Sequence, residues 1–316
     1  MVINIILFTV GLFLLIKGAD WLVNGASIIA RKQQVSDLAI GLTIVAFGTS
    51  APELVVNLAA SLENHQDIVF ANIIGSNNFN LFFILGVAGL ITPLVVQSST
   101  LFKEIPISLG AGVIVLFLAN SFIFQGEILS RIDGIILLML FLVFLWYVYT
   151  QLKREPVLEE IRENNLPSWK IWGLIIIGLL ALIVGGKLVV NGAVSMATSF
   201  GVSEKLIGLT VIAAGTSLPE LATSVVAALK RKSDIAIGNV IGSNIFNIFF
   251  ILGISATVRP IDFDTTFNRD IYLFIAGTAI LFLLLFFGRK KLRRPAAIFL
   301  VITFIAYTFY QVSLEI

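Results

Sequence analysis

The chain has 316 residues, of which 58% are hydrophobic and 13% charged, and its mean hydropathy is +1.01. These values lie far outside the range of a soluble globular domain, and they favour a polytopic membrane protein with no nucleic-acid partner. The chain has no cysteine, which excludes disulfides, thiolate metal ligands and thiol catalysis. The net charge of +2 excludes little, because charge distribution matters more than the sum in a membrane protein.

Apolar stretches of about 20 residues, each long enough to cross a bilayer as a helix, recur along the chain. They predict an all-α fold with ten transmembrane helices, at residues 2–30, 38–61, 68–91, 104–125, 131–150, 169–197, 204–228, 234–257, 270–288 and 293–314. The longest polar break follows the fifth helix. We therefore predict a first five-helix repeat at 1–150, a cytoplasmic linker at 151–168 and a second five-helix repeat at 169–316.

The two halves are copies of one another. An offset of 167 residues, from Val35 to Val202, continues without a gap to Pro93 and Pro260. Because each repeat holds an odd number of spans, the second repeat must enter the membrane from the opposite side. This inverted arrangement is typical of many secondary transporters.

The basic residues of the loops predict the orientation. The loops on one side of the predicted spans hold fifteen lysines and arginines, and those on the other side hold four. Cytoplasmic loops carry the excess of positive charge. We therefore expect a multi-pass protein of the cell (plasma) membrane with both termini extracellular and the central loop in the cytoplasm.

A short motif occurs once in each half, as GTSAPE at 48–53 and GTSLPE at 215–220. Each copy places a carboxylate, Glu53 or Glu220, inside an apolar stretch. An ionisable side chain at membrane depth costs several kcal/mol, so such residues usually face the bundle interior and bind or move a charged species. A single buried glutamate is explained almost as well by protonation, but a duplicated pair flanked by prolines and hydroxyls favours one shared cation site.

The prolines of the motif predict broken helices. Pro52 has no amide hydrogen and its ring clashes with the carbonyl four residues earlier, so the helix should break near Gly48. Backbone carbonyls at the break become candidates to face a ligand, among them those of Ala46 and its equivalent Ala213. Broken backbone at membrane depth is tolerated only where protein or a wet cavity covers it.

The next helix in each half carries a polar stripe at helical spacing, formed by Asn72, Ser76 and Asn80 and by Asn239, Ser243 and Asn247. Asn77 and Asn244 sit beside these stripes. Amides and serines in membrane helices often serve only packing and interhelical hydrogen bonds. For that reason we expect Asn72, Asn77, Asn239 and Asn244 to lie outside the primary site.

All of these candidate ligands are oxygen atoms, which suits calcium or sodium rather than zinc, copper or iron. Two ionised glutamates would be cancelled by one divalent ion, and calcium's demand for six to eight oxygens fits better than magnesium's octahedron. Without a cation, two like charges would face each other in low dielectric. Obligatory exchange of one cation for another follows.

The paired motifs GTSAPE with GSNNFN, and GTSLPE with GSNIFN, resemble the two alpha repeats of the sodium/calcium exchanger family. The chain is similar to prokaryotic members without a regulatory domain. The resemblance implies sodium-driven calcium transport through one central cluster, with the first and sixth helices sliding across the rest. It implies these ligands: Glu53, Glu220, Asn80, Asn247, Thr49, Ser50, Thr216, Ser217, Ser76, Ser243 and the carbonyls of Ala46 and Ala213.

The resemblance also carries finer expectations. Potassium-dependent exchangers have an aspartate where this chain has Asn247, so the neutral amide indicates exchange without potassium. The family's exchange of three sodium ions for one calcium would move one net charge per cycle and make transport electrogenic. We expect no enzyme activity, no cofactor besides the transported Ca²⁺ and Na⁺, and no protein partner, so that the chain acts as a monomer.

Three other functions compete with this interpretation. A proton/calcium antiporter is the nearest, because two buried carboxylates can trade protons as readily as sodium. A cation channel is disfavoured by broken helices in an inverted repeat, which favour alternating access. An intramembrane hydrolase would need chemical groups that are missing: the chain has no cysteine and only one histidine, His65, in a predicted loop.

Overall fold

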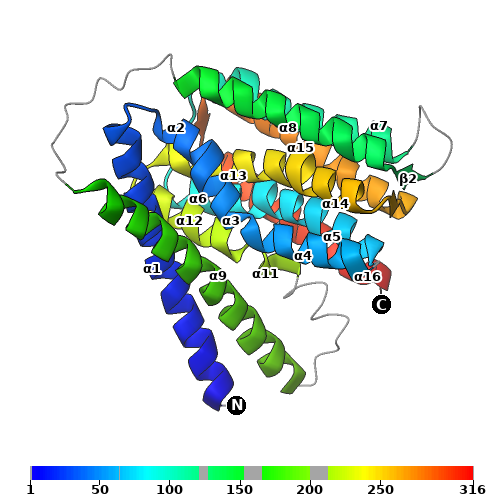
Figure 1. Cartoon of the computed structure of the whole chain (residues 1–316), viewed down its shortest axis with the longest axis horizontal. Coiled ribbons are helices and arrows are strands. Elements are labelled where there is room, and N and C mark those ends of the chain that lie inside the picture. The colour runs from blue at the N-terminus through cyan, green and yellow to red at the C-terminus, as the bar shows by residue number, and fades with distance from the viewer. Residues whose placement is uncertain (1, 64, 121–126, 153–165, 200–212, 316) are drawn as a thin grey trace.

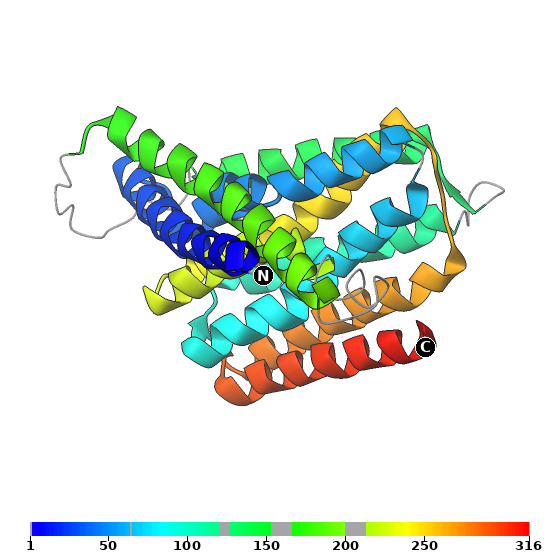
Figure 2. The same cartoon turned by 90° about the horizontal axis from the view of Figure 1, so that it is seen from below.

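Two long helices, α1 (Val2–Lys32) and α9 (Ser168–Ser199), lie side by side and run obliquely to the other helices (Figure 1). Figure 2 shows the same pair crossing one face of the bundle. The structure is a computed structural model that describes residues 2–63, 65–120, 127–152, 166–199 and 213–315. Within these residues the chain is almost entirely helical.

Glycines allow α1 and α9 to approach closely. A Cβ atom added at Gly18 would lie 2.8 Å from the carbonyl oxygen of Gly178, and one at Gly178 would lie 2.8 Å from that of Gly18. Gly11 and Gly185 form a second such contact one heptad away. Small residues at a membrane helix interface let the backbones pack directly, which is a main source of association in lipid. The two helices therefore form one tightly packed unit.

The second span is broken where the proline predicts it. It consists of α2 (Asp37–Ile40), the π-helical turn η1 (Gly41–Val45), α3 (Ala46–Thr49) and α4 (Ala51–Glu63), with a bend of 46° at Ser50. Its counterpart in the second half contains α11 (Ala213–Gly215) and α12 (Leu218–Leu229). The earlier part of the predicted span 204–228 lies outside the described residues.

Two spans occupy the centre of the bundle. One is α5 (Gln66–Asn78), η2 (Phe79–Ile84) and α6 (Leu85–Ile91); the other is α13 (Ser233–Ile245), η5 (Phe246–Leu252) and α14 (Gly253–Val258). Within their most apolar windows, 72% and 94% of the residues are buried, against 11% for the last helix. These are the spans that carry the asparagine and serine stripes.

The outer helices are η3 (Thr100–Glu104) with α7 (Ile105–Ala119), α8 (Arg131–Leu152), η6 (Thr265–Phe267) with α15 (Asn268–Phe287), and α16 (Arg294–Glu315). α15 packs on α7, α16 on α6 and α8 on α14. Their outward faces expose large apolar side chains such as Trp146, Phe287 and Phe309, as expected of helices in contact with lipid.

Eight helices in the described part of the chain are long and apolar enough to span a membrane, or nine if the bent pair at Ser50 is one span. The expectation of a helical polytopic membrane protein is thus confirmed. One boundary was wrong: the fourth span begins at Thr100 rather than at residue 104, and its described part ends at Ala119. Lys103 and Glu104 lie inside this helix, and the hydroxyl of the partly buried Tyr147 on α8 bonds the carboxylate of Glu104.

The fold is not purely α-helical. β1 (Leu94–Val95) pairs with β4 (Lys291–Leu292), and β2 (Ile128–Leu129) pairs with β3 (Ile261–Asp262), both antiparallel. Strands of two residues carry no detectable periodicity in a sequence. Each ribbon joins a connection from the first half to one from the second, so both tie the halves together.

The glycine contact between α1 and α9 can be tested by adding one methyl group. Gly178→Ala should lower the free energy of unfolding by about 1–3 kcal/mol, because the new Cβ would overlap the backbone of Gly18. Gly173→Ala on the same helix is the control: nothing lies within 4 Å of its Cβ position, so stability should stay equal or rise. Thermal unfolding in detergent measures both, and equal Tm values would contradict the packing described.

Candidate cation site

The two glutamates of the repeated motif lie in the middle of the bundle. Glu53 is in the first turn of α4 and Glu220 in the first turn of α12, and their exposed fractions are 1% and 0%. Each follows a break in its span, so each carboxylate sits at a helix N-terminus, where the helix dipole favours negative charge. In the part of the chain that the structure describes, neither glutamate forms an ion pair with a lysine or arginine.

Serines connect the two glutamates across the halves. Ser50 Oγ donates to Glu220 Oε1 at 2.9 Å, and Ser217 Oγ donates to Glu53 Oε1 at 3.0 Å. Each serine precedes the glutamate of its own half by three residues and bonds the glutamate of the other half. Two helix starts that are far apart in sequence are therefore held face to face, with both carboxylates between them.

Several oxygens around these carboxylates have no hydrogen-bond partner. They are Glu53 Oε2, Glu220 Oε2, Ser76 Oγ, Asn80 Oδ1 and Asn247 Oδ1, and all are buried. A buried polar atom without a partner costs free energy, and native structures keep few of them. Five such oxygens from both halves form a set that a cation would satisfy.

A series of hydrogen bonds between four asparagines orients two of these oxygens. Asn80 Nδ2 donates to Asn244 Oδ1 at 3.1 Å, and Asn247 Nδ2 donates to Asn77 Oδ1 at 3.0 Å. Asn77 Nδ2 in turn donates to the backbone carbonyl of Asn244 at 3.2 Å. Asn80 and Asn247 both use their side-chain nitrogens in these bonds, so their side-chain oxygens are left for another partner. Asn80 and Asn247 both lie in π-helical turns, which are frequent at functional sites.

The threonines of the motif are also held by amides from the other half. Thr49 Oγ1 donates to Asn239 Oδ1 at 3.0 Å, and Thr216 Oγ1 donates to Asn72 Oδ1 at 3.1 Å. Both threonine oxygens keep lone pairs for a further contact. Ser243 Oγ lies 3.4 Å from Glu220 Oε1 and completes the hydroxyls around that carboxylate.

The backbone carbonyls agree less well with the sequence prediction. The Ala46 carbonyl is not free, because it accepts a hydrogen bond from the Ser50 amide at 3.0 Å and lies 3.3 Å from Thr49 Oγ1. The proline removes the partner of Gly48, two residues later, so the helix is still intact at Ala46. Ala213, the equivalent of Ala46, is the first described residue of α11 and lies four residues before Ser217.

The structure thus brings together the side chains that the motif and the stripes single out. What the sequence analysis missed is the part played by Asn72, Asn77, Asn239 and Asn244, which hold the threonines and the site amides in place. Their positions beside the stripes were visible in the sequence. Their partners were not, because every one of these bonds crosses from one half to the other.

Helices of membrane-spanning length around a buried, oxygen-lined centre define a polytopic membrane transport protein. The sequence also matches the family model described as sodium/calcium exchanger protein, over residues 3–150 and 170–313. The chain belongs to this family, whose members are exchangers and not enzymes. The resemblance seen in the paired motifs is confirmed.

Individual relatives agree over nearly the whole chain. The inner membrane protein YrbG of Escherichia coli strain K12 is 40% identical over 90% of this chain and 89% of its own length. The sodium/calcium exchanger MaX1 of Methanosarcina acetivorans is 29% identical over 98% of this chain and 99% of its own. A solved structure of the sodium-calcium exchanger NCX_Mj, soaked with 10 mM Na⁺ and zero Ca²⁺, superposes with a TM-score of 0.83 and 34% identity, covering 97% of this chain and 98% of that one.

The reciprocal serine contacts lead to a stability prediction. Ser50→Ala should lower the free energy of unfolding by about 1–3 kcal/mol in buffer without sodium or calcium, since Glu220 Oε1 loses its 2.9 Å donor. Ser61→Ala is the matched control, because that buried serine bonds only the Asn57 carbonyl of its own helix. Unfolding in detergent, followed by tryptophan fluorescence, compares the two, and a Ser61→Ala effect as large as that of Ser50→Ala would contradict this account.

Proposed function

We propose that this protein is a sodium/calcium antiporter that exchanges Na⁺ for Ca²⁺ at one central site by alternating access. The proposal rests on the unpartnered oxygens around two carboxylates, each of which accepts a hydrogen bond from a serine of the other half. Exchangers of sodium and calcium among its relatives support it.

The chemistry of the donors favours these two ions. Carboxylate, hydroxyl and amide oxygens are hard ligands, and no sulfur or imidazole lies among the site residues. One calcium ion would cancel the charge of Glu53 and Glu220, and sodium ions would have to bind in multiples. Asn80 and Asn247 are neutral amides at equivalent positions, so the site carries no third carboxylate. We therefore also propose exchange that is independent of potassium and moves net charge.

We propose that the ligand set consists of Glu53, Glu220, the paired residues from the motifs and stripes, and the two backbone carbonyls. The members besides the glutamates are Thr49, Ser50, Ser76, Asn80, Thr216, Ser217, Ser243, Asn247, Ala46 and Ala213. The Ala46 carbonyl would bind through its second lone pair, or in place of the Thr49 hydroxyl. The amides Asn72, Asn77, Asn239 and Asn244 would orient these ligands, in the way that residues behind a metal's own ligands commonly do.

We propose that the chain contains ten spans in two inverted repeats, at 1–150 and 169–316, joined by a cytoplasmic linker at 151–168. Matching contacts in the two halves support this organisation, since most partners of the central site recur at an offset of 167 residues. Both termini would then be extracellular, in the cell membrane. Because one chain supplies both halves of the site, we propose that the monomer is the working unit.

Alternating access needs two gates, and the structure offers a pair of candidates. Lys230, at the end of α12, places Nζ 2.6 Å from Asp20 Oδ1 and 2.6 Å from Asn24 Oδ1 on α1. The offset of 167 residues relates Asp20 to Lys187 on α9 and Lys230 to Glu63 on α4, so the same pair recurs with its charges exchanged. The two pairs would lie at opposite faces of the membrane.

Only one of these gates is closed in the structure. Glu63 is exposed and its ion-pair partner is His65 at 3.9 Å, while Lys187 forms no ion pair with any residue that the structure describes. Likewise, α1 packs along α12 and no comparable contact joins α9 to α4. A rigid α1–α9 unit that makes one pair and breaks the other as it slides would open the site to one face at a time. In this state the face that we predict to be cytoplasmic is closed.

The proposed exchange is tested in reconstituted vesicles loaded with sodium. ⁴⁵Ca²⁺ uptake should require an outward sodium gradient and should generate a membrane potential. Potassium or choline gradients should drive none. Uptake driven by a pH gradient alone would instead identify a proton/calcium antiporter, and flux without any counter-ion would identify a channel.

Glu53→Gln and Glu220→Gln test the site itself. Each variant should lose calcium transport to background, because a neutral amide removes half of the charge that holds the ion, while the elution profile in detergent stays that of a folded protein. Glu127→Gln, an exposed glutamate just before β2, is the control for expression and assembly. Near-normal flux in either variant would remove that carboxylate from the site.

The gate is tested by the accessibility of a buried position on α1. Val23→Cys, in a chain without other cysteines, is fully buried and lies three residues after Asp20. Adding Lys230→Gln should raise its rate of maleimide labelling about two- to fivefold, the size expected for a partly exposed ion pair.

Two further variants decide whether the ion pair is responsible. The exchange Asp20→Lys with Lys230→Asp should restore the slow labelling. Lys232→Gln should leave labelling unchanged, because the ion pair of Lys232 is with Asp37 of α2 and not with Asp20. If the exchanged pair labels as fast as Lys230→Gln alone, the gate is not held by this contact.

A further inference from the structure

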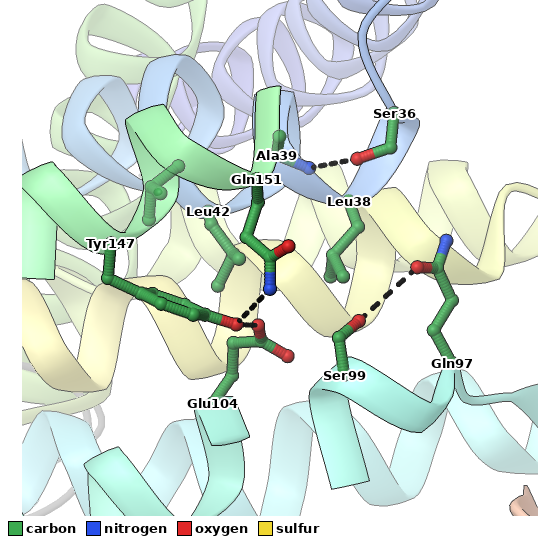
Figure 3. A pocket seen from close by; sticks show the side chains of 10 residues that line it. Ser36, Leu38, Ala39, Leu42, Gln97, Ser99, Glu104, Tyr147 and Gln151 are labelled. Carbon is green, nitrogen blue, oxygen red and sulfur yellow. Dashed lines mark hydrogen bonds between the residues drawn. The ribbon is translucent and has the colours of Figure 1, made fainter. Parts of the chain in front are cut away.

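A second buried carboxylate lies away from the central site. Glu104, at the start of the α7 span, borders a small pocket between α2 and η1, the segment around Gln97 and Ser99, and α8 (Figure 3). The pocket has a volume of about 10 Å³, room for one water molecule or one small ion. Glu104 is 1% exposed, so bulk solvent does not reach it in this conformation.

Hydrogen bonds leave one oxygen of this carboxylate without a partner. Tyr147 donates its hydroxyl proton to Glu104 Oε1, and Gln151 Nε2 donates to the Tyr147 oxygen at 2.9 Å, as Figure 3 shows. This chain fixes the tyrosine proton on the side of Glu104. Glu104 Oε2 has no partner, and neither has the buried hydroxyl of Thr100 one turn earlier.

The charged groups around the pocket do not neutralise Glu104. Lys103 directs its ammonium over the Tyr147 ring, 5.6 Å from the ring centre, and makes no ion pair with Glu104. On the neighbouring elements, Asp37 is paired with Lys232 at 2.9 Å, and Asp234 accepts from Gln97 at 2.7 Å. Among the residues that the structure describes, none therefore forms an ion pair with the buried Glu104 carboxylate.

The second half contains a similar arrangement that is satisfied by the protein. There Gln311 Nε2 bonds both the Tyr307 hydroxyl, at 2.5 Å, and Asp270 Oδ1, at 2.8 Å. The tyrosine and glutamine are four residues apart on α16, as Tyr147 and Gln151 are on α8. Asp270 is only partly buried and takes a direct amide donor. The comparison singles out Glu104 as the carboxylate that still needs a partner.

We propose that the Glu104 pocket binds one monovalent cation, a sodium ion or a proton, at a site separate from the central one. Glu104 Oε2 would be its charged ligand, and the Ser99 hydroxyl and the Gln97 side-chain carbonyl are the other oxygens of the lining that could contribute. One positive charge cancels the carboxylate. A divalent ion would leave an uncompensated charge and would lack the six to eight oxygens that calcium requires. One wall of this pocket is α2, which is the upstream part of the broken span that carries Thr49 and Ser50.

This proposal does not depend on the central site, and its test removes that site. The purified double variant Glu53→Gln/Glu220→Gln would be studied by infrared difference spectroscopy in the carboxyl region. One arm adds sodium in place of N-methyl-D-glucamine at constant pH, and the other changes pH without sodium. A carboxyl band that responds in either arm and disappears on adding Glu104→Gln supports the site. Response to sodium identifies a sodium site, and response to pH alone identifies a proton site.

Two further variants separate Glu104 from other groups and protect the test against misfolding. Asp270→Asn should leave the band in place, because the band is assigned to Glu104, whereas Asp270 already accepts a hydrogen bond from Gln311. Tyr147→Phe keeps the carboxylate and removes its donor, so the band should shift in frequency and remain. If no band sensitive to Glu104→Gln or Tyr147→Phe responds to sodium or to pH, the pocket holds no exchangeable cation and the proposal is overturned.

Discussion

The structure depends on two carboxylates that are buried together and form no ion pair with a basic side chain in the described part of the chain. Ser50 and Ser217 hold each glutamate against the helix start of the opposite half, so neither charge can move away from the other without breaking a bond. Such a pair is stable only with a cation or with protons between its members. In the function that we propose, the broken helices, the unpartnered oxygens and the series of amide bonds present ligands to a cation bound between these carboxylates.

The rest of the architecture consists of a central core and a pair of long helices across it. The core is the pair of central spans, tied across the halves by asparagine side chains and by two short ribbons. Across this core lies the α1–α9 pair, whose two helices pack closely at their glycines. The α1–α9 pair contacts the rest of the bundle through α1 on α12 and through α9 on α11 and α12, and the ion pair of Lys230 with Asp20 lies at this boundary. In the exchange cycle that we propose, the α1–α9 pair slides over the core at this boundary.

Buried carboxylates in this protein have two different environments. Glu53 and Glu220 are surrounded by hydroxyls and amides from four helices, which can supply many oxygens to an ion. Glu104 has a tyrosine, a free oxygen and space for a single small particle. The difference in oxygen number is what separates a site suited to calcium and sodium from one suited to a single monovalent charge.

Local signals in the sequence determined a large part of this result. The length of the apolar stretches predicted the membrane spans, and Pro52 and Pro219 predicted the breaks, because both effects act within a few residues. The duplicated motifs predicted which carboxylates and hydroxyls belong together, because they recur at a constant offset in the two halves. Only the tertiary structure decided which oxygens remain unpartnered, that Asn72, Asn77, Asn239 and Asn244 support the site, and that Glu104 lies inside a helix beside Tyr147. These features depend on partners more than 40 residues away, at distances set by how the helices pack. A polar side chain in a sequence does not reveal which of its atoms will be left without a bond.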